Sequence, residues 1–160
     1  MDISKYIYKR DCKFFRGDIP CRQHKEFNVH CSACDFYQKE SGKILIIKLG
    51  AIGDVIRTTP LLHKIKNEYS NYSIWWLTLT TDVLPNSVDK KLKFNLENTL
   101  LIEATKFDIL INLDKDNFAC ALAKRIKAKE KFGFTLKKGK PAPANSLSEE
   151  KFVTGIFDDA

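Results

Sequence analysis

Two groups of residues in this sequence are of types and spacings that can do chemistry. The first is the pair Gly53-Asp54, which comes shortly after the aliphatic run Ile44–Ile47. A carboxylate in a ligand-binding turn can accept a proton from a substrate hydroxyl as a general base. The second group is a set of thiols near the start of the chain, which can bind a metal ion as thiolates. Its members are Cys12, Cys21, Cys31 and Cys34.

The segment around Asp54 predicts a strand, a tight turn and a helix. Ile44–Ile47 is short, rich in β-branched residues and apolar on both faces, which is typical of a central parallel strand covered by helices on both sides. Gly50 and Gly53 then mark the turn, and a helical pattern of apolar residues begins at Val55. Asp54 therefore lies at the start of a helix, just past the carboxyl end of a strand, where ligands of open α/β sheets bind.

The turn has the spacing G-x-x-G-D, which is neither the dinucleotide-binding fingerprint nor the P-loop pattern. Glycine lets a backbone approach a ligand closely, and the first amides of a helix favour an anion or a polar hydroxyl. The candidate substrate-binding residues of this segment are Gly50, Ala51, Gly53, Arg57, Thr58 and Thr59. The alternative is purely structural, because aspartate and threonine are common helix caps and the arginine can be a solvated side chain.

Apolar patterning predicts the rest of an α/β fold. The helix after Asp54 reaches about Tyr69, with either a kink or a second helix start at Pro60, because proline cannot donate a helical hydrogen bond. Trp75 and Trp76 fall on opposite faces of their strand, so both faces must be covered. The further elements are strands at Ser73–Thr80, Thr99–Glu103, Phe107–Asp114 and Lys131–Thr135, and a helix at Phe118–Ala128. Together they predict a Rossmann-like parallel sheet with helices on both faces.

The strand Phe107–Asp114 ends in two polar side chains, Asn112 and Asp114, which face the same direction if the strand persists. They lie on the ligand edge of the sheet. We expect either a ligand contact there or capping of the next helix by Asp114 or Asp116. Cys120, among the alanines of that helix, is interpreted as a small buried packing residue.

The segment Lys43–Pro60, with Leu61-Leu62 and Ser73–Thr78, resembles the start of glycosyltransferase family 9, the ADP-heptose:lipopolysaccharide heptosyltransferases. The shared pattern is an apolar strand, Gly-Asp, Thr-Thr-Pro-Leu-Leu, and a second strand that ends in Leu-Thr. The resemblance covers roughly Lys43–Phe134 and implies the N-terminal half of a GT-B fold. It also implies that Asp54 is the general base that deprotonates a sugar acceptor, such as a lipopolysaccharide core, as its hydroxyl attacks a nucleotide-sugar donor. No catalytic metal is expected for such an enzyme.

In that family a second Rossmann-like domain holds most of the nucleotide-sugar. The present sequence shows no second glycine turn and no second set of alternating strands after residue 135, so a C-terminal donor-binding domain is missing from it. We therefore expect three regions: 1–42, a Cys-rich leader; 43–135, the acceptor-side domain; and 136–160, a basic loop or hairpin and a truncated helix. The lysines of the last region either meet acceptor phosphates or the membrane surface, or belong to a solvated loop. The chain alone, as a fragment or the product of a truncated gene, is expected to be inactive.

The cysteines of the leader have the spacing C-x8-C-x9-C-x2-C, and in a reducing compartment clustered cysteines more often bind metal than form disulfides. The pair Cys31 and Cys34 is a natural corner of a tetrahedral site. A structural zinc ion, an iron–sulfur cluster and free thiols all remain open, since a cluster also accepts four thiolates. A non-catalytic zinc-knuckle binding or assembly domain is the alternative function. Nucleic acid is an unlikely partner, because residues 1–42 hold 8 Lys and Arg against 6 Asp and Glu, a net charge of only +2.

Length and composition set the outer limits. A chain of 160 residues with 44% hydrophobic and 29% charged residues suits one globular domain with a small appendage. No aliphatic run is long enough for a transmembrane helix, and the N-terminus lacks the apolar segment of a secretory signal. These features predict a cytoplasmic protein, with peripheral contact at the inner membrane. The net charge of +7 favours anionic partners without choosing among them.

Overall fold

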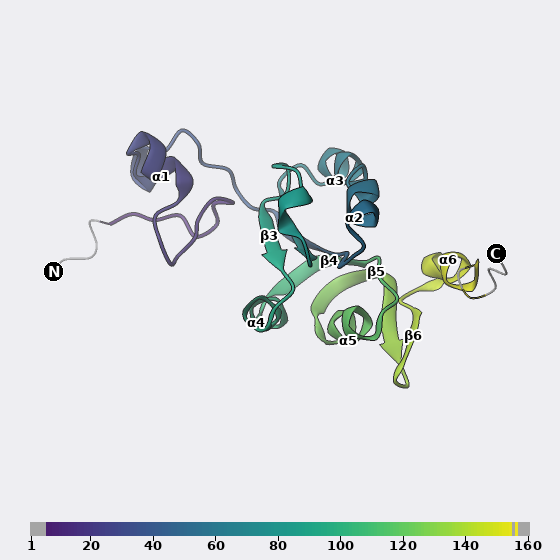
Figure 1. Cartoon of the computed structure of the whole chain (residues 1–160). Coiled ribbons are helices and arrows are strands. Elements are labelled where there is room, and N and C mark those ends of the chain that lie inside the picture. The colour runs from purple at the N-terminus through teal and green to yellow at the C-terminus, as the bar shows by residue number, and fades with distance from the viewer. Residues whose placement is uncertain (1–5, 155, 157–160) are drawn as a thin grey trace. The chain divides into compact units, whose positions relative to one another are not determined.

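The computed structural model describes residues 6–154 and 156, and it divides the chain into two compact units, Met1–Ser41 and Gly42–Ala160 (Figure 1). The larger unit contains the sheet, and the smaller unit contains the four clustered cysteines. Parts of the predicted leader and of the predicted terminal helix, at 1–5, 155 and 157–160, lie outside the described residues. Among the described residues, no helix is both long enough and apolar enough to cross a bilayer.

Within the described part of the larger unit, six strands form one sheet in the order β3-β2-β1-β4-β5-β6. Strands β1 to β5 are parallel, and β6 is antiparallel to β5. The strands are β1 Gly42–Ile47, β2 Tyr72–Thr78, β3 Lys90–Lys93, β4 Lys106–Asn112, β5 Lys127–Lys137 and β6 Lys140–Pro143. The order reverses between β1 and β4, which is the doubly wound arrangement of Rossmann-like folds. The predicted fold class is therefore confirmed, with an antiparallel edge strand added.

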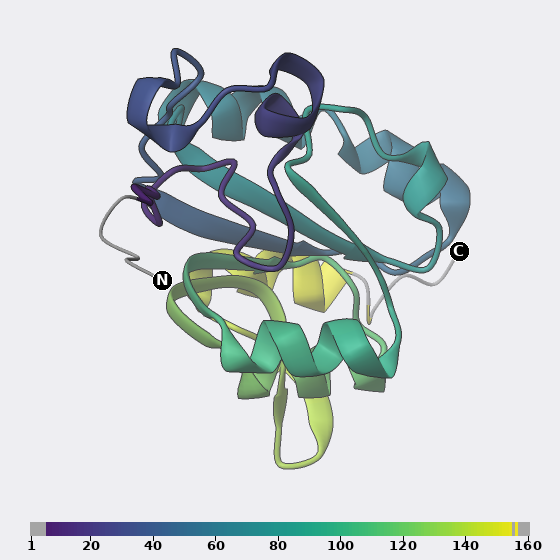
Figure 2. The ribbon, with the colours of Figure 1, turned by 90° about the vertical axis from the view of Figure 1, so that its left-hand side faces the viewer.

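Helices cover both faces of this sheet (Figure 2). On one face, Leu45 and Ile47 of β1 pack in a cluster with residues of α4 and α5, and on the other Ile44 and Ile46 pack with residues of α2 and α3. The alternation along β1 thus feeds two separate cores, which explains why its apolar run has no polar side. The described helices are α1 Arg22–Phe27, α2 Ile52–Thr58, α3 Leu61–Glu68, α4 Leu96–Ala104, α5 Asn117–Arg125 and α6 Glu149–Thr154, with 3-10 turns η2 Cys31–Ala33, η3 Thr81–Val83 and η4 Ser146–Ser148.

The tryptophan pair of β2 lies as predicted, with one ring in each core. Trp75 packs in the α4 and α5 core, where its ring meets Phe107 edge-on at a centroid distance of 5.3 Å. Trp76 is fully buried in the opposite core. Each ring therefore helps to hold one layer of helices on the sheet.

One open alternative is resolved by the structure, and one predicted strand is wrong. Of the two possibilities at Pro60, the structure has the second helix start, since α2 ends at Thr58 and α3 begins at Leu61. The predicted strand Thr99–Glu103 is wrong, because this segment lies inside helix α4. The side chain of Asn95 accepts a hydrogen bond from the Asn98 amide at 2.9 Å and so caps α4. The third strand is instead β3, a short edge strand that is mostly lysine.

The basic segment after residue 135 forms the hairpin between β5 and β6. Its turn places Lys138 and Gly139 at φ values of 49° and 77°, the left-handed conformation that two-residue hairpin turns need. Pro141 and Pro143 lie in β6, where an edge strand tolerates residues without an amide proton. The hairpin therefore continues the same sheet as the strands before it.

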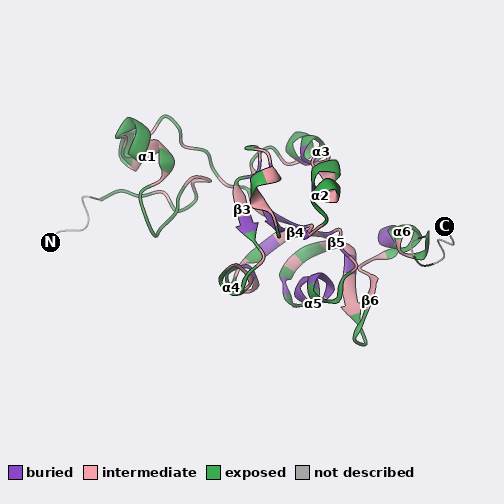
Figure 3. Cartoon of the chain, in the orientation of Figure 1, coloured by how far each residue is buried: buried purple, intermediate pink, exposed green. Residues whose placement is uncertain are grey.

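The smaller unit has little regular structure. It contains α1, η2 and an isolated antiparallel bridge between Cys12 and Lys39. Among its described residues, 6–41, none is buried (Figure 3). Residues 6–41 consequently form no hydrophobic core of the kind that the larger unit has on both faces of the sheet.

Candidate functional site at the carboxyl edge of the sheet

A pocket of about 380 Å³ lies at the carboxyl ends of four neighbouring strands. The lining comes from residues within four positions of the ends of β1, β2, β3 and β4, and from one residue of α5. The lining residues are Leu49, Gly50, Leu79, Phe94, Asp114, Asp116 and Phe118. The pocket thus includes the point between β1 and β4 where the strand order reverses, which is the usual ligand site of such sheets.

A buried ion pair joins the ends of β1 and β4 beneath this pocket. The Lys48 ammonium and the Leu49 amide both donate to the Asp114 carboxylate, and Lys48 Nζ also donates to the Gly50 carbonyl at 2.6 Å. The side chains of Lys48 and Asp114 are only 12% and 9% exposed. Asn112 supports the same turn, since its Oδ1 accepts from the Asp114 amide at 3.1 Å. Both carboxylate oxygens of Asp114 are therefore used to position the strand ends.

The Asp114→Asn variant tests this positioning role. We expect the free energy of unfolding to fall by about 3–5 kcal/mol, because the Lys48 ammonium would be left buried without its counter-charge. Urea denaturation followed by circular dichroism measures the loss. Glu68→Gln is the matched control, since its ion pair with Lys64 is exposed on α3 and contributes less than about 1 kcal/mol. Equal losses in the two variants would contradict the role given to the buried pair.

Asp54 lies in the first turn of α2 at the same edge of the sheet. Its side chain is 43% exposed, and its carboxylate pairs with the Arg57 guanidinium one turn along the helix. The hydrogen bond from Arg57 lowers the pKa of Asp54, so the carboxylate is ionised at neutral pH. Asp54 does not line the pocket. A Cβ built on Gly53 would meet no atom within 4 Å, so the space beside this turn is open.

The other predicted substrate-binding residues divide between the pocket and the helix. Gly50 lines the pocket, whereas Arg57 is a largely solvent-exposed side chain of α2. The Thr58 hydroxyl donates to the Asp54 carbonyl at 2.6 Å, and the Thr59 hydroxyl donates to the Ile56 carbonyl at 2.8 Å. These bonds are the local ones that threonine makes within a helix, and they leave the hydroxyl oxygens free only to accept. Substrate contact by these residues stays a prediction.

Several lining residues were missed by sequence analysis. Phe94 follows the edge strand β3, whose sequence lacks the apolar alternation by which a strand is recognised. Leu79 and Phe118 have apolar side chains without polar atoms, so they do not stand out as candidate binding residues. Phe118 is 73% exposed and Leu79 52% exposed beside the pocket. Asp116, one of the two residues considered as a cap, does cap α5 by accepting from the Ala119 amide at 2.9 Å. The signal that the sequence did offer was Asp116 at a helix start, two residues before Phe118.

Replacing Arg57 by glutamine is expected to raise the pKa of Asp54 toward its ordinary value, because the main cause that lowers it is removed. A lowered pKa keeps the carboxylate ionised to more acidic pH, so in the variant protonation begins at higher pH. A ¹³C-detected NMR titration of the side-chain carboxyl carbons measures this directly. Arg125→Gln, which removes a guanidinium that pairs with Glu103 at 2.7 Å, should leave Asp54 unchanged. An unchanged Asp54 titration in Arg57→Gln would rule out the pair in solution.

No family model matches this chain, and no curated protein matches it. Solved structures do show a similar fold. One is a glycosyl transferase family 9 protein from Veillonella parvula DSM 2008, with 21% identity and a TM-score of 0.48 over 60% of this chain. Another is the heptosyltransferase WaaC of E. coli with ADP, with 15% identity and a TM-score of 0.47 over 57% of this chain. The chain spans about a third of the length of these two proteins, 32% and 34%.

Proposed function

We propose that this chain is the acceptor-side part of a glycosyltransferase. The enzyme would move a sugar from a nucleotide-sugar donor such as ADP-heptose to a lipopolysaccharide core or another sugar acceptor. The sequence resemblance across Lys43–Phe134 supports the family, and one observation supports the chemistry: Asp54 is an exposed, ionised carboxylate in the first turn after the central strand β1. The donor would be held by a second domain, in the same polypeptide or in a partner.

In this proposal the acceptor hydroxyl donates a hydrogen bond to the Asp54 carboxylate. As the hydroxyl oxygen bonds to the anomeric carbon of the donor, its proton passes to Asp54, and the nucleoside diphosphate leaves with the electron pair of the broken bond. In the free protein the Arg57 guanidinium pairs with the Asp54 carboxylate, and this pairing makes the carboxylate a weaker base. The arriving hydroxyl therefore has to displace Arg57, and the carboxylate becomes more basic as it does so.

We assign the acceptor sugar to the pocket at the strand ends, with its reacting hydroxyl extending out of the pocket to Asp54, which lies outside the lining at the same edge of the sheet. The charge of Asp114 is balanced by Lys48, and in the described residues no cation pairs with Asp116, so the lining disfavours a phosphate. Carboxylate oxygens accept hydrogen bonds from sugar hydroxyls, while the rings of Phe94 and Phe118 offer apolar surface to the C–H face of a sugar. These features together favour a neutral, hydroxylated ligand over a nucleotide.

The lysines of the β5–β6 hairpin suggest the surface on which the protein binds its acceptor. Lys137, Lys138 and Lys140 surround its tip, and they can bind phosphate groups on an acceptor or the anionic cytoplasmic face of a membrane. We therefore propose a cytoplasmic protein that works at the inner membrane surface. Flotation with vesicles that contain anionic lipid tests this, and loss of flotation at high salt is the expected result.

The assay for the proposed function is transfer of heptose from ADP-heptose to a core oligosaccharide, with a donor-binding domain supplied in the same polypeptide or as a separate chain. We expect product only when the present chain is included. Saturation-transfer NMR with the chain alone is expected to show binding of the oligosaccharide and not of ADP. Binding of ADP without binding of any oligosaccharide would overturn the acceptor-side assignment.

A further inference from the structure

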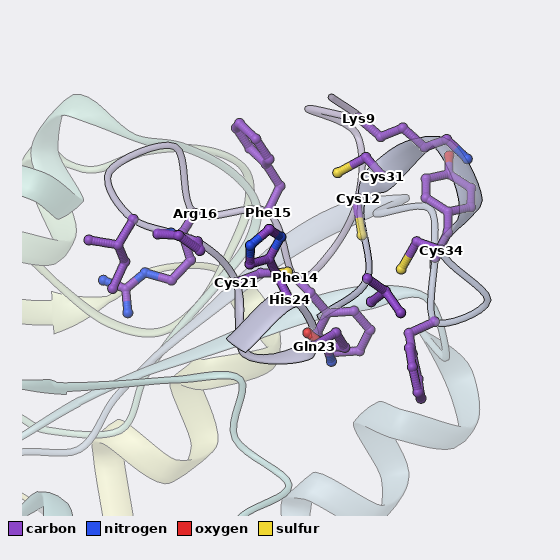
Figure 4. Close-up of a pocket in the computed structure, with 15 residues that line it drawn as sticks. Lys9, Cys12, Phe14, Phe15, Arg16, Cys21, Gln23, His24, Cys31 and Cys34 are labelled. Carbon is purple, nitrogen blue, oxygen red and sulfur yellow. The ribbon is translucent and has the colours of Figure 1, made fainter. Parts of the chain in front are cut away.

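The four clustered cysteines line one small pocket in the smaller unit. This pocket has a volume of about 130 Å³, and Cys12, Cys21, Cys31 and Cys34 all contribute to it, as Figure 4 shows. All four are free and partly buried, so none is held in a disulfide. Thiols that lie up to 22 positions apart in the sequence are therefore gathered around a single space.

The smaller unit holds this arrangement without a hydrophobic core. None of its described residues, 6–41, is buried, and Phe27 and Phe36 are 56% and 40% exposed. Units of this size need a cross-link or a metal ion when burial cannot offset the entropy of ordering the chain. With no disulfide among the described cysteines, binding of a metal ion is the remaining way in which these side chains can cross-link the unit.

The backbone presents the cysteines from defined turns. The Cys12 carbonyl accepts from the Phe15 amide at 2.9 Å, and the Cys34 carbonyl accepts from the Tyr37 amide at 3.3 Å. The other two precede or begin helical turns, since Cys21 stands before α1 and Cys31 starts η2. The backbone of Cys12 also forms an isolated antiparallel bridge with Lys39, which ties the segment around Cys12 to the end of the unit.

We propose that Cys12, Cys21, Cys31 and Cys34 bind one Zn²⁺ ion as thiolates and that this ion holds the smaller unit folded. Each thiol gives up its proton to solvent as its sulfur bonds to zinc. In the described residues no three metal-binding side chains converge on one point, so the sulfurs turn onto the ion as it binds. Lys9 lines the same pocket and supplies a positive charge that partly offsets the negative charge of four thiolates on a divalent ion.

The ligand set consists of sulfur alone. His24 also lines the pocket, but its ring is engaged edge-on with His30 at a centroid distance of 4.8 Å. Four thiolates complete the tetrahedral coordination that structural zinc prefers, and they leave no position for the imidazole. The proposal concerns the smaller unit only and does not depend on the proposed glycosyl transfer.

Metal analysis of the purified full chain is the first test. We expect about one zinc per chain in the wild type, and loss of zinc in the serine variants of each of the four cysteines. Cys120→Ser and His24→Gln are the controls that should keep zinc. Iron with acid-labile sulfide in place of zinc, zinc lost in His24→Gln, or zinc kept in the cysteine variants would overturn the proposal.

Thiol alkylation of the wild-type chain avoids variants that fail to fold. Cys120 is fully buried in the larger unit, and burial raises its pKa to about 11, so it stays protonated and unreactive in the native protein. After chelation we expect mass spectrometry to find the four pocket cysteines alkylated, and after addition of ZnCl₂ we expect all four to be protected together. Reaction of all four in the presence of excess zinc would show that the thiols are free.

Discussion

The Asp54→Asn variant is expected to lose about 10²–10⁴-fold in the rate of glycosyl transfer, the range that a general base supplies. Asparagine keeps the size of the side chain and its place in the first turn of α2, but it cannot take up the hydroxyl proton at neutral pH. Because Asp54 is exposed and contacts solvent, the fold should be unaffected. The measurement is initial transfer from ADP-heptose with the donor-binding domain supplied, together with a thermal unfolding curve for each protein.

The control for this variant is Asp82→Asn. Asp82 is an exposed carboxylate in η3, just after β2 and hence at the same edge of the sheet. Its replacement removes the same charge and should leave the transfer rate within a small factor of wild type. The acceptor affinity of Asp54→Asn, measured by NMR titration, is expected to change little, because the asparagine Oδ1 can still accept the hydrogen bond from the acceptor hydroxyl and only the transfer of its proton is lost. Near-normal transfer by Asp54→Asn would reject the base role.

The fold was predictable where local pattern and burial agree. The composition of Ile44–Ile47 predicts a strand that helices cover on both faces. The placement of Trp75 and Trp76 on opposite faces follows from strand geometry alone. The segment Thr99–Glu103 misled because Leu100, Leu101 and Ile102 form an apolar run of strand length. In α4 only Ile102 of this run is buried, so its hydrophobicity does not report its environment.

Strand β3 was missed for the opposite reason, because its sequence is polar although it forms a strand. Its sequence, Lys90–Lys93, contains one buried residue, Leu92, because the strand lies at the edge of the sheet next to β2. An edge position allows charged side chains, which removes the period-two pattern by which strands are recognised. A short polar edge strand is defined by its neighbour, and the neighbour is known only after the chain has folded.

The position of the pocket was predictable, but its lining was not. The carboxyl edge after β1 follows from the strand–turn–helix pattern, and Asp54 lies there. The partner of Asp114 does not follow from any pattern, since Lys48 is 66 residues away in the sequence. Phe94 and Phe118 join the pocket because four strand ends come together, which is a property of the tertiary arrangement. Local spacing thus predicts at which edge of the sheet a pocket lies, and long-range contacts decide which side chains line it.

Removal of zinc is expected to unfold residues 6–41 while the sheet of the larger unit stays intact. The larger unit has a buried core on each face of its sheet, whereas the described part of the smaller unit has no buried residue. For structural zinc sites the binding free energy, about 10–16 kcal/mol at pH 7 in zinc-finger peptides, is also folding free energy. Loss of the proposed ion therefore removes more stability than a unit without a core can replace.

Two-dimensional ¹H–¹⁵N NMR before and after chelation separates the two units in one sample. We expect the amide signals of residues 6–41 to collapse into the unfolded range and to return on addition of Zn²⁺, while those of β1, β2 and β4 keep their positions. Acidification should produce the same selective loss, because protons compete with the ion for thiolates, and the loss should begin at higher pH when free zinc is low. Addition of Mg²⁺ in place of Zn²⁺ is the control and should restore nothing, since magnesium prefers oxygen ligands. If the signals of residues 6–41 stay dispersed after metal analysis has shown that the zinc is gone, the unit is held by its backbone contacts, and the cysteines have no structural metal to bind.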